Sequence, residues 1–202
     1  MMMSVAVIAY HRAMGRWEPD ARGRLAKAAM ALYAEQGFEQ TTVAEIAARA
    51  GLTERTFFRH FADKREVLFY GTDRLRDLLA RAVAGAPASA TPMDAVGAAL
   101  EAAGAMFQEN PERVRLRDAI VSANAELRER ELIKLATLAA VMAGALRDRG
   151  IAEPAASLAA EAGVAVFKVA FARWVGEPGQ PDLPGIFRES MAELRGTFAT
   201  RA

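Results

Sequence analysis

The chain has 202 residues, of which 52% are hydrophobic and 7% aromatic, and its formal net charge at pH 7 is +1. This length supports one domain, or a small domain joined to a larger one, with a core of ordinary size. The absence of cysteine excludes disulfides, thiol nucleophiles and cysteine-based metal sites, and two histidines leave little for a metal cluster. We therefore expect a cytoplasmic protein with no cofactor and no metal.

The first ten residues, MMMSVAVIAY, form an apolar run that is too short to span a bilayer, which needs about 20 residues, and that lacks the basic start of a secretory signal. We predict that residues 1–18 are a flexible extension, either an arm or the product of a mis-assigned start codon. No later segment reaches about 18 apolar residues without a charge, so no transmembrane helix is expected. The common metal-helix and phosphate-loop motifs are absent as well.

Alanine, leucine, glutamate and arginine dominate the remaining chain, and glycine and proline fall at long intervals, so we predict an all-α fold of about nine helices. The first helix begins at Asp20 and ends at Gly37. The second begins at Thr42, which with Glu45 forms a capping box, and it ends at Gly51.

The third helix begins after Thr53, and six more helices follow. Asp63 is predicted to cap a fourth helix, and Ser122 to cap a long one. The expected ranges are 64–84, 93–109, 112–120, 123–149, 154–175 and 185–199.

The segment GLTERTFFRHF, residues 51–61, has the composition expected of the second helix of a helix-turn-helix, whose two short helices would span residues 42–61. At about 100° per residue, Phe57 and Phe61 fall on one face. Arg55, Thr56 and Arg59 fall on the other, where an arginine can donate two hydrogen bonds to guanine, and Phe58 lies at the border.

Hydroxyls, backbone N–H groups and cations at helix starts suit phosphate contacts. Each of these residues alone also fits a role without DNA, as a helix cap or a solvated charge. The combination favours DNA binding. Two such short helices bury little surface of their own, so an arginine-bearing face next to an aromatic core indicates a surface that is presented to a partner. The predicted DNA-binding residues are Thr42, Thr53, Arg55, Thr56, Phe58, Arg59, His60 and Lys64.

The run from Arg22 to Leu68, including TTVAEIAARAGLTERTFFRHFADKREVL, closely resembles the N-terminal DNA-binding domain of TetR-type transcriptional repressors. The resemblance implies a three-helix DNA-binding domain at 19–79, followed by a ligand-binding and dimerisation domain at 80–202. Two positions depart from the family pattern. Phe58 stands where tyrosine is usual, which removes a phosphate hydrogen bond, and Arg55 stands where a small residue is frequent.

Residues 41–70 hold five basic and four acidic side chains, so no broad positive field is expected there. Binding must then depend on placed contacts and on doubling by dimerisation. Arg12, Arg16, Arg22 and Arg24 are candidates for an N-terminal arm on DNA, and a disordered tail is the alternative.

The segment 153–175 is apolar on nearly every side, with small residues that permit close helix approach. We predict that one side faces its own domain and the other joins the last helix in a four-helix dimer interface, as the resemblance also implies; a wholly internal core helix is the alternative. The predicted interface residues are Ala159, Ala162, Val166, Trp174, Phe187, Met191, Leu194 and Phe198.

The intervening helices are rich in methionine and alanine, which adapt to irregular apolar ligands, although such a stripe is more often core. The segment 125–175 resembles the acyl-CoA-like ligand-binding group of TetR-type regulators, to which the mycofactocin-associated regulator belongs, and this implies a long-chain acyl-CoA or similar effector. Arg113 and Arg115 are further candidates for its polar head, unless they form a solvated basic face. The predicted pocket residues are Met106, Phe107, Leu116, Arg117, Ile120, Asn124, Leu138, Met142, Phe167 and Phe171.

Together these expectations describe a homodimeric repressor that leaves a palindromic operator when it binds a hydrophobic effector. The alternatives are an activator or a ligand-independent regulator of the same fold, a helical adaptor, and a helical-bundle enzyme. The enzyme lacks carboxylate and histidine pairs at the needed spacing, so we expect no catalysis.

Overall fold

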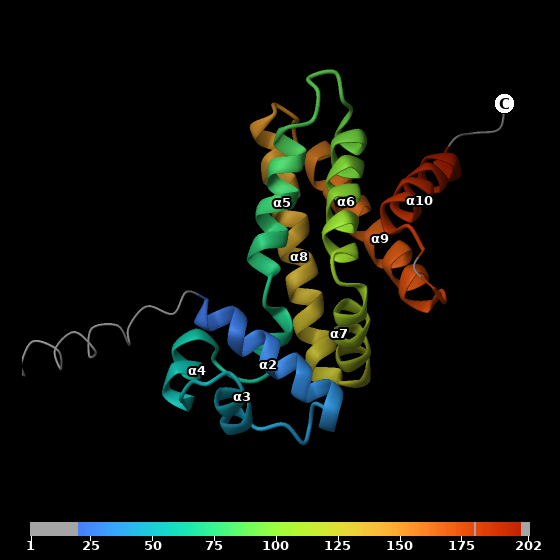
Figure 1. Ribbon diagram of the computed structural model, residues 1–202. Coiled ribbons are helices and arrows are strands. Elements are labelled where there is room, and N and C mark those ends of the chain that lie inside the picture. Colours follow the sequence, from blue (N-terminus) through green and yellow to red (C-terminus); the bar gives the residue numbers. More distant parts are fainter. Residues whose placement is uncertain (1–19, 180, 199–202) are drawn as a thin grey trace, which may run out of the picture. The chain divides into compact units, whose positions relative to one another are not determined.

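The computed structural model describes residues 20–179 and 181–198, and every regular element there is helical (Figure 1). The all-α prediction is confirmed, since this part of the chain holds nine α-helices, α2 to α10, and one short 3-10 helix. The predicted flexible extension, residues 1–18, lies outside the described residues. The chain divides into two compact units, 1–68 (the N-terminal unit) and 69–202 (the C-terminal unit).

The N-terminal unit contains α2 (Ala21–Gln36), α3 (Val43–Arg49) and α4 (Glu54–His60), and the 3-10 helix η2 (Glu66–Phe69) follows them. Asp20 begins α2 as predicted, because its carboxylate accepts a hydrogen bond of 2.8 Å from the backbone of Gly23. Gly37 ends the helix at φ 89°, a conformation that glycine adopts without strain. The buried side chains that hold these helices together include Leu25, Leu32, Tyr33, Ile46, Phe57 and Phe61.

The C-terminal unit is a helical bundle that begins with α5 (Thr72–Ala84), α6 (Pro92–Gln108) and α7 (Pro111–Ala123). It continues with α8 (Ala125–Asp148), α9 (Ala155–Gly176) and α10 (Leu183–Phe198). Within it, α5 packs on α6 and α8, while α9 packs on α6, α8 and α10 (Figure 1). Its buried core includes Leu79, Val83, Leu100, Leu138, Met142, Leu146, Trp174 and Phe187.

Glycine lets helices approach closely at two points in this bundle. A methyl group built on Gly163 of α9 would lie 2.4 Å from Val96 Cγ1 of α6, and one built on Gly104 would lie 2.9 Å from the backbone nitrogen of Pro184. Both distances are shorter than atoms tolerate, so the spacing of α6 from α9 and α10 depends on these glycines.

By length and composition alone, α9 is long and apolar enough to cross a membrane, although it carries Glu161, Lys168 and Arg173 and so does not meet the charge-free criterion applied to the sequence. Its best window has a mean hydropathy of 1.5, and 39% of that window is buried inside the structure. The helix packs on three others and buries Trp174 completely, which is the behaviour of a core helix.

The predicted fourth helix, 64–84, is wrong as a single element. Asp63 does accept a hydrogen bond from Glu66 N, at 2.9 Å, but it caps only the 3-10 helix. The chain then turns at Gly71, whose φ of 99° lies in the left-handed region, and α5 begins one residue later.

The predicted cap Ser122 is also wrong, because it lies inside α7. The break falls at Asn124, whose backbone is extended and whose side-chain amide donates to Ile120 O at 2.8 Å.

The compact division falls after Leu68, whereas the sequence placed a boundary after residue 79. The reason is that α5 buries Leu75, Leu79 and Val83 in the core of the C-terminal unit. Which functions the two units carry stays a prediction.

Candidate nucleic-acid interface

Two capped helices and a glycine turn build the helix-turn-helix of the N-terminal unit. The Thr42 hydroxyl accepts from Glu45 N at 3.2 Å, and the Glu45 carboxylate accepts from Thr42 N at 2.8 Å, so the predicted capping box is confirmed. Hydrogen bonds from Thr42 hold the pKa of Glu45 below its ordinary value. The turn passes through Gly51 at φ 68°, and Thr53 then caps α4 by accepting from Thr56 N at 3.2 Å.

The helix α4 is fixed by the phenylalanines that the sequence assigned to its inner face. Phe57 and Phe61 are buried, and their ring centroids lie 5.6 Å apart. Phe58 is 56% exposed and meets the edge of Phe57 at 5.5 Å. A helix of seven residues is too short to be stable alone, so this anchoring is what orients its outer face.

The outer face of α4 presents Arg55 and Arg59, both exposed, on either side of Phe58. In the described part of the chain neither guanidinium takes part in an ion pair or a hydrogen bond. Two forks of N–H donors beside an exposed ring suit guanine O6 and N7 and a thymine methyl group. The structure therefore places Arg55 and Arg59 on the exposed face of α4 beside Phe58, and their contacts with bases stay a prediction.

The predicted phosphate contacts at the helix starts are already hydrogen-bonded within the chain. The Thr42 hydroxyl lies 2.8 Å from the Glu45 carboxylate, and the Thr53 and Thr56 hydroxyls lie 3.1 Å apart. Thr42 and Thr53 are exposed, and Thr56 is half-buried. Each threonine hydroxyl can still donate or accept one further hydrogen bond. The first backbone N–H groups of α4 point out of the N-terminus of the helix, toward the side where Thr53 lies.

His60 ends α4 in a half-buried position, and its Nε2 has no hydrogen-bond partner among the described residues. Burial lowers the pKa of His60 below its ordinary value, and the nearby cations Arg59 and Arg22 lower it further. The imidazole is therefore neutral at pH 7, so it can offer phosphate a hydrogen bond but no charge.

Lys64 is engaged by backbone carbonyl groups of the N-terminal unit. Its ammonium group donates to the carbonyl oxygens of Phe38, Glu39 and Thr41 at 2.9, 3.1 and 3.0 Å, and it lies 4.7 Å from the centroid of the Phe38 ring. An ammonium has three N–H donors, so all of them are engaged. Lys64 thus stabilises the loop between α2 and α3, and its predicted contact with phosphate stays a prediction.

Arg22 and Arg24 belong to α2 and not to an arm, while Arg12 and Arg16 lie outside the described residues. The Arg22 guanidinium lies 5.4 Å from the centroid of Phe61. Arg24 donates to Ala50 O at 2.5 Å and so caps the end of α3.

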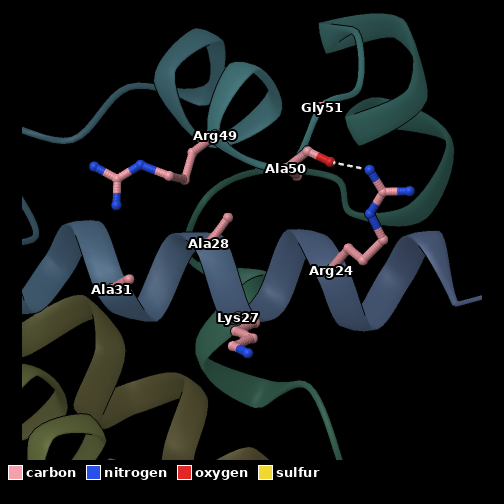
Figure 2. Close-up of a pocket in the computed structure, with 7 residues that line it drawn as sticks. All are labelled: Arg24, Lys27, Ala28, Ala31, Arg49, Ala50 and Gly51. Carbon is pink, nitrogen blue, oxygen red and sulfur yellow. Dashed lines mark hydrogen bonds between the residues drawn. The ribbon is translucent and has the colours of Figure 1, made fainter.

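The sequence did not reveal how α2 and α3 are joined. Arg49 and Glu35 form a two-pronged ion pair at 2.9 and 2.7 Å, which holds the pKa of Glu35 below its ordinary value. The two residues lie on different helices, so no periodicity within one helix relates them. Beside this pair lies a hollow of about 460 Å³, shown in Figure 2, lined by Arg24, Lys27, Ala28, Ala31, Arg49, Ala50 and Gly51.

The predicted pocket residues gather in the C-terminal unit, though not all in one environment. Phe107, Phe167 and Phe171 are half-buried, and their ring centroids lie 5.4 to 6.0 Å apart. Leu138 and Met142 are buried in the core, and the half-buried ones are Met106, Leu116, Ile120 and Asn124. The assignment of a pocket stays a prediction.

The cations expected at the pocket mouth are partly engaged. Arg117 forms a two-pronged ion pair with Glu131 and lies 5.1 Å from the ring of Phe69. Arg115 lies 4.7 Å from the ring of Trp174. Arg113 is half-buried at the start of α7.

Most of the predicted interface residues are already covered by their own chain. The buried ones are Ala159, Val166, Trp174, Phe187 and Met191; Ala162 and Leu194 are half-buried, and the side chain of Phe198 lies outside what the structure describes. The large apolar side chains that α9 exposes are Leu158 and Val169. A helix that is apolar all round gives no indication in its sequence of which side faces its own core, and the assignment of a dimer interface stays a prediction.

Comparison with known proteins places the N-terminal unit in a family. Residues 25–70 match the sequence pattern of bacterial regulatory proteins of the TetR family. The chain carries a TetR-family DNA-binding domain. TetR-family proteins with this domain are transcription factors and not enzymes, in agreement with the sequence prediction.

A curated TetR-family relative supports the same assignment. The chain is 37% identical over 81 residues to the helix-turn-helix transcriptional regulator TcmR of Streptomyces glaucescens. The matched stretch is 40% of this chain and 36% of TcmR, so the chain spans about a third of the length of this curated relative.

Solved TetR-type structures share the fold over nearly the whole chain. The fatty acid degradation regulator FadR of Bacillus halodurans has a TM-score of 0.63 and 18% identity, covering 92% of this chain and 100% of its own. FadR of Thermus thermophilus, a TetR-family repressor solved with lauroyl-CoA, has a TM-score of 0.59 and 22% identity, covering 90% and 96%. FadR of Bacillus subtilis, solved with stearoyl-CoA, has a TM-score of 0.62 and 18% identity, covering 85% and 96%. At these identities the likeness shows the fold.

Proposed function

We propose that the chain is a cytoplasmic, homodimeric transcriptional repressor that leaves a palindromic operator when it binds a hydrophobic or acyl-CoA-like effector. The observation that carries the DNA-binding part is the outer face of α4, where Arg55, Phe58 and Arg59 are exposed above a buried phenylalanine anchor. One such helix reads one half-site, so a symmetric pair suits a palindrome, with half-sites about 34–36 Å apart.

The DNA-binding proposal is tested by fluorescence anisotropy with duplexes from the DNA that flanks the gene. Wild-type protein should bind one duplex specifically, and Arg59→Ala should weaken this binding by about 1–3 kcal/mol, the value of a bidentate contact to guanine. The thermal midpoint should stay within about 1 °C of wild type, because Arg59 is exposed and has no partner in the described chain.

A matched control is Arg81→Ala, which removes another exposed arginine, on α5. It should leave both operator affinity and stability unchanged. If Arg59→Ala lowers the midpoint strongly and Arg81→Ala does not, then Arg59 supports the fold and the proposed contact to bases is wrong.

The effector part of the proposal depends on the C-terminal unit. Its half-buried phenylalanines and methionines offer apolar contacts to an alkyl chain, and FadR proteins of this fold were solved with acyl-CoA molecules. Release requires that the effector favour the conformation that binds DNA poorly, since a ligand with equal affinity for both conformations would not change operator affinity.

Titration calorimetry with lauroyl-CoA and stearoyl-CoA tests this part, together with operator anisotropy in the presence of each. We expect binding heat and a fall in operator affinity of about 5- to 150-fold, the usual range of allosteric coupling. Absence of both effects, in a protein that still binds its operator, would identify a regulator that does not respond to acyl-CoA.

A further inference from the structure

Arg24 of α2 is bonded to the turn of the helix-turn-helix (Figure 2). Its Nη2 donates to the carbonyl oxygen of Ala50 at 2.5 Å, although the two residues are 26 positions apart in the chain. Ala50 is the residue at which α3 ends, and Gly51 and Leu52 lead from it to Thr53, the cap of α4. The bond therefore holds α2 to the turn that sets the direction of α4.

The backbone of this turn leaves one carbonyl group for Arg24. The N–H groups of Gly51 and Leu52 donate to carbonyl oxygens in the last turn of α3, at 3.0 and 2.8 Å, in the pattern of a Schellman motif. Neither bond uses the carbonyl of Ala50. Arg24 supplies a charged donor to it, and a charged donor makes a stronger hydrogen bond than a neutral one.

Gly51 gives the guanidinium room to approach. Its φ of 68° lies in the left-handed region, which glycine adopts without strain. A methyl group built on Gly51 would also lie 3.0 Å from Arg24 Nη2, closer than most such contacts, so a side chain here would press against the guanidinium. The glycine therefore serves the backbone of the turn and the bond from Arg24 together.

A second arginine from the same turn of α2 contacts the other end of α4. The guanidinium carbon of Arg22 lies 5.4 Å from the ring centroid of Phe61, the residue at which α4 ends. A cation is attracted to the face of an aromatic ring at this distance. Ala50 and Phe61 stand on either side of the segment 51–60, so α2 holds both ends of the helix that carries Arg55.

We propose that Arg24 is a positioning residue for DNA binding, which fixes the angle between α2 and α4 without touching DNA itself. The inference rests on the DNA-binding part of the proposed function. A helix of seven residues has too few contacts of its own to hold its direction, and two-pronged contacts with guanine depend on direction. A helix α4 that is free to tilt should lose its specific contacts before its general attraction to phosphates.

The alternative is that Arg24 binds a DNA phosphate directly, as basic side chains of DNA-binding domains do. In the structure its guanidinium meets a carbonyl oxygen at the carboxyl end of α3, where the helix dipole is negative. This environment holds a cation within the fold, which favours the positioning role.

Arg24→Met removes the guanidinium and keeps an apolar stem, and DNA binding is measured by fluorescence anisotropy at a temperature where circular dichroism shows each variant to be folded. We expect operator binding to weaken by about tenfold, and binding to a duplex of unrelated sequence to stay within about twofold of wild type. The slope of log Kd against log salt concentration should be that of wild type, whereas a direct contact would reduce it by about 0.9 for each phosphate lost.

Lys27→Met is the matched control. Lys27 is an exposed cation of α2 that lines the same hollow as Arg24, and it takes part in no ion pair or hydrogen bond within the described ranges. Its substitution should change neither operator affinity nor the ratio of specific to non-specific binding.

Amide hydrogen exchange, followed by mass spectrometry, examines the turn without DNA. Arg24→Met should speed exchange in residues 51–61 by about tenfold or more and leave exchange in α8 unchanged, because the lost bond holds only the turn and α4. Lys27→Met should exchange as wild type does in both regions.

The outcomes are distinguishable. An Arg24→Met protein with wild-type exchange and wild-type specificity overturns the positioning role and leaves the DNA-binding proposal standing. An equal loss of affinity for operator and unrelated DNA, with a smaller salt slope, overturns it in favour of a direct phosphate contact. A wild-type protein that binds no duplex specifically overturns the proposed function, and this inference with it.

Discussion

Basic side chains of the helix-turn-helix region fall into two groups: some extend into solvent, and others are hydrogen-bonded within the fold. Arg55 and Arg59 extend from α4 without partners in the described residues, whereas the ammonium of Lys64 is surrounded by three carbonyl oxygens. Residue type does not distinguish the two cases, because both are basic residues on short capped segments. The difference lies in the carbonyl groups that the loop between α2 and α3 turns toward Lys64.

We therefore expect Lys64→Met to lower the free energy of unfolding by about 2 kcal/mol, since it leaves three carbonyl groups without their charged donor. Urea denaturation measures this. Lys27→Met, which changes an exposed lysine on α2, should cost less than about 0.5 kcal/mol. If the two variants are equally stable and only Lys64→Met loses operator affinity, the lysine serves DNA after all.

Asp118 on α7 gives the C-terminal unit a pH-dependent stability. Burial raises the pKa of its carboxyl group, the cation of Arg117 opposes the rise, and Glu131 adds to it. The folded state therefore keeps this proton to higher pH than the unfolded state does. The stabilising contribution is fully present below the ordinary pKa of aspartate, about 3.9, and is lost as the pH rises through the raised value.

Asp118→Asn removes this dependence, so it should melt about 1–2 °C above wild type at pH 7, and the gain should vanish near pH 3.5. Differential scanning calorimetry at several pH values measures both. Asp77→Asn alters an exposed carboxylate of α5 and is the control. Its melting temperature should show no comparable gain over wild type, either at pH 7 or near pH 3.5. A gain that persists at low pH would point to a cause other than the proton.

The packing of α9 on α6 depends on Gly163, which has no side chain. The methyl group of an alanine at 163 would lie 2.4 Å from Val96 Cγ1, and the next nearest atom is Met142 Cε at 3.6 Å. A valine methyl on a packed helix has few ways to move aside, because its rotamer is fixed by its own backbone.

Gly163→Ala should therefore destabilise the protein by about 1–3 kcal/mol through overpacking, despite the better helix propensity of alanine. Gly196→Ala is the matched control, since nothing lies within 4 Å of a methyl group built there, and it should stabilise α10 by about 0.5–1 kcal/mol. Equal stabilisation by both changes, measured by denaturant unfolding, would show that α6 and α9 are not in close contact.

For the whole molecule, DNA affinity should depend on joining two reading helices rather than on the total charge. The chain carries a net charge of +1, so its electrostatic attraction to a duplex is weak. Each half-site then contributes little by itself, and linking two half-sites converts the second binding event into an intramolecular one.

Leu158 is 65% exposed on α9, the helix that we expect to take part in the homodimer. Leu158→Lys should therefore weaken operator binding by about 10²- to 10⁴-fold, although it leaves α4 untouched. Anisotropy with the operator measures this loss, and binding to a single half-site duplex should stay within about twofold of wild type. Ile133→Lys alters a side chain that is 67% exposed on α8, and it should bind the full operator normally. An unchanged operator affinity in a monomeric Leu158→Lys protein would mean that one copy suffices.

The sequence by itself determined the helix-turn-helix, because its signals are local. The box of Thr42 and Glu45, the turn at Gly51, the cap at Thr53 and the phenylalanines one turn apart each depend on residues three or four positions away. The helix periods likewise determined the all-α class. These features are set by backbone hydrogen bonding and side-chain spacing within a single turn.

Tertiary structure decided what depends on distant parts of the chain. It decided that Lys64 binds carbonyl oxygens some 25 residues away, that Arg49 pairs with Glu35, and which side of the uniformly apolar α9 remains uncovered. It also broke the expected helix 64–84 at Gly71. The physical reason is that hydrophobic burial and ion pairing depend on which surfaces meet, and a local pattern cannot specify the partner when several faces of a helix are equally suited to it.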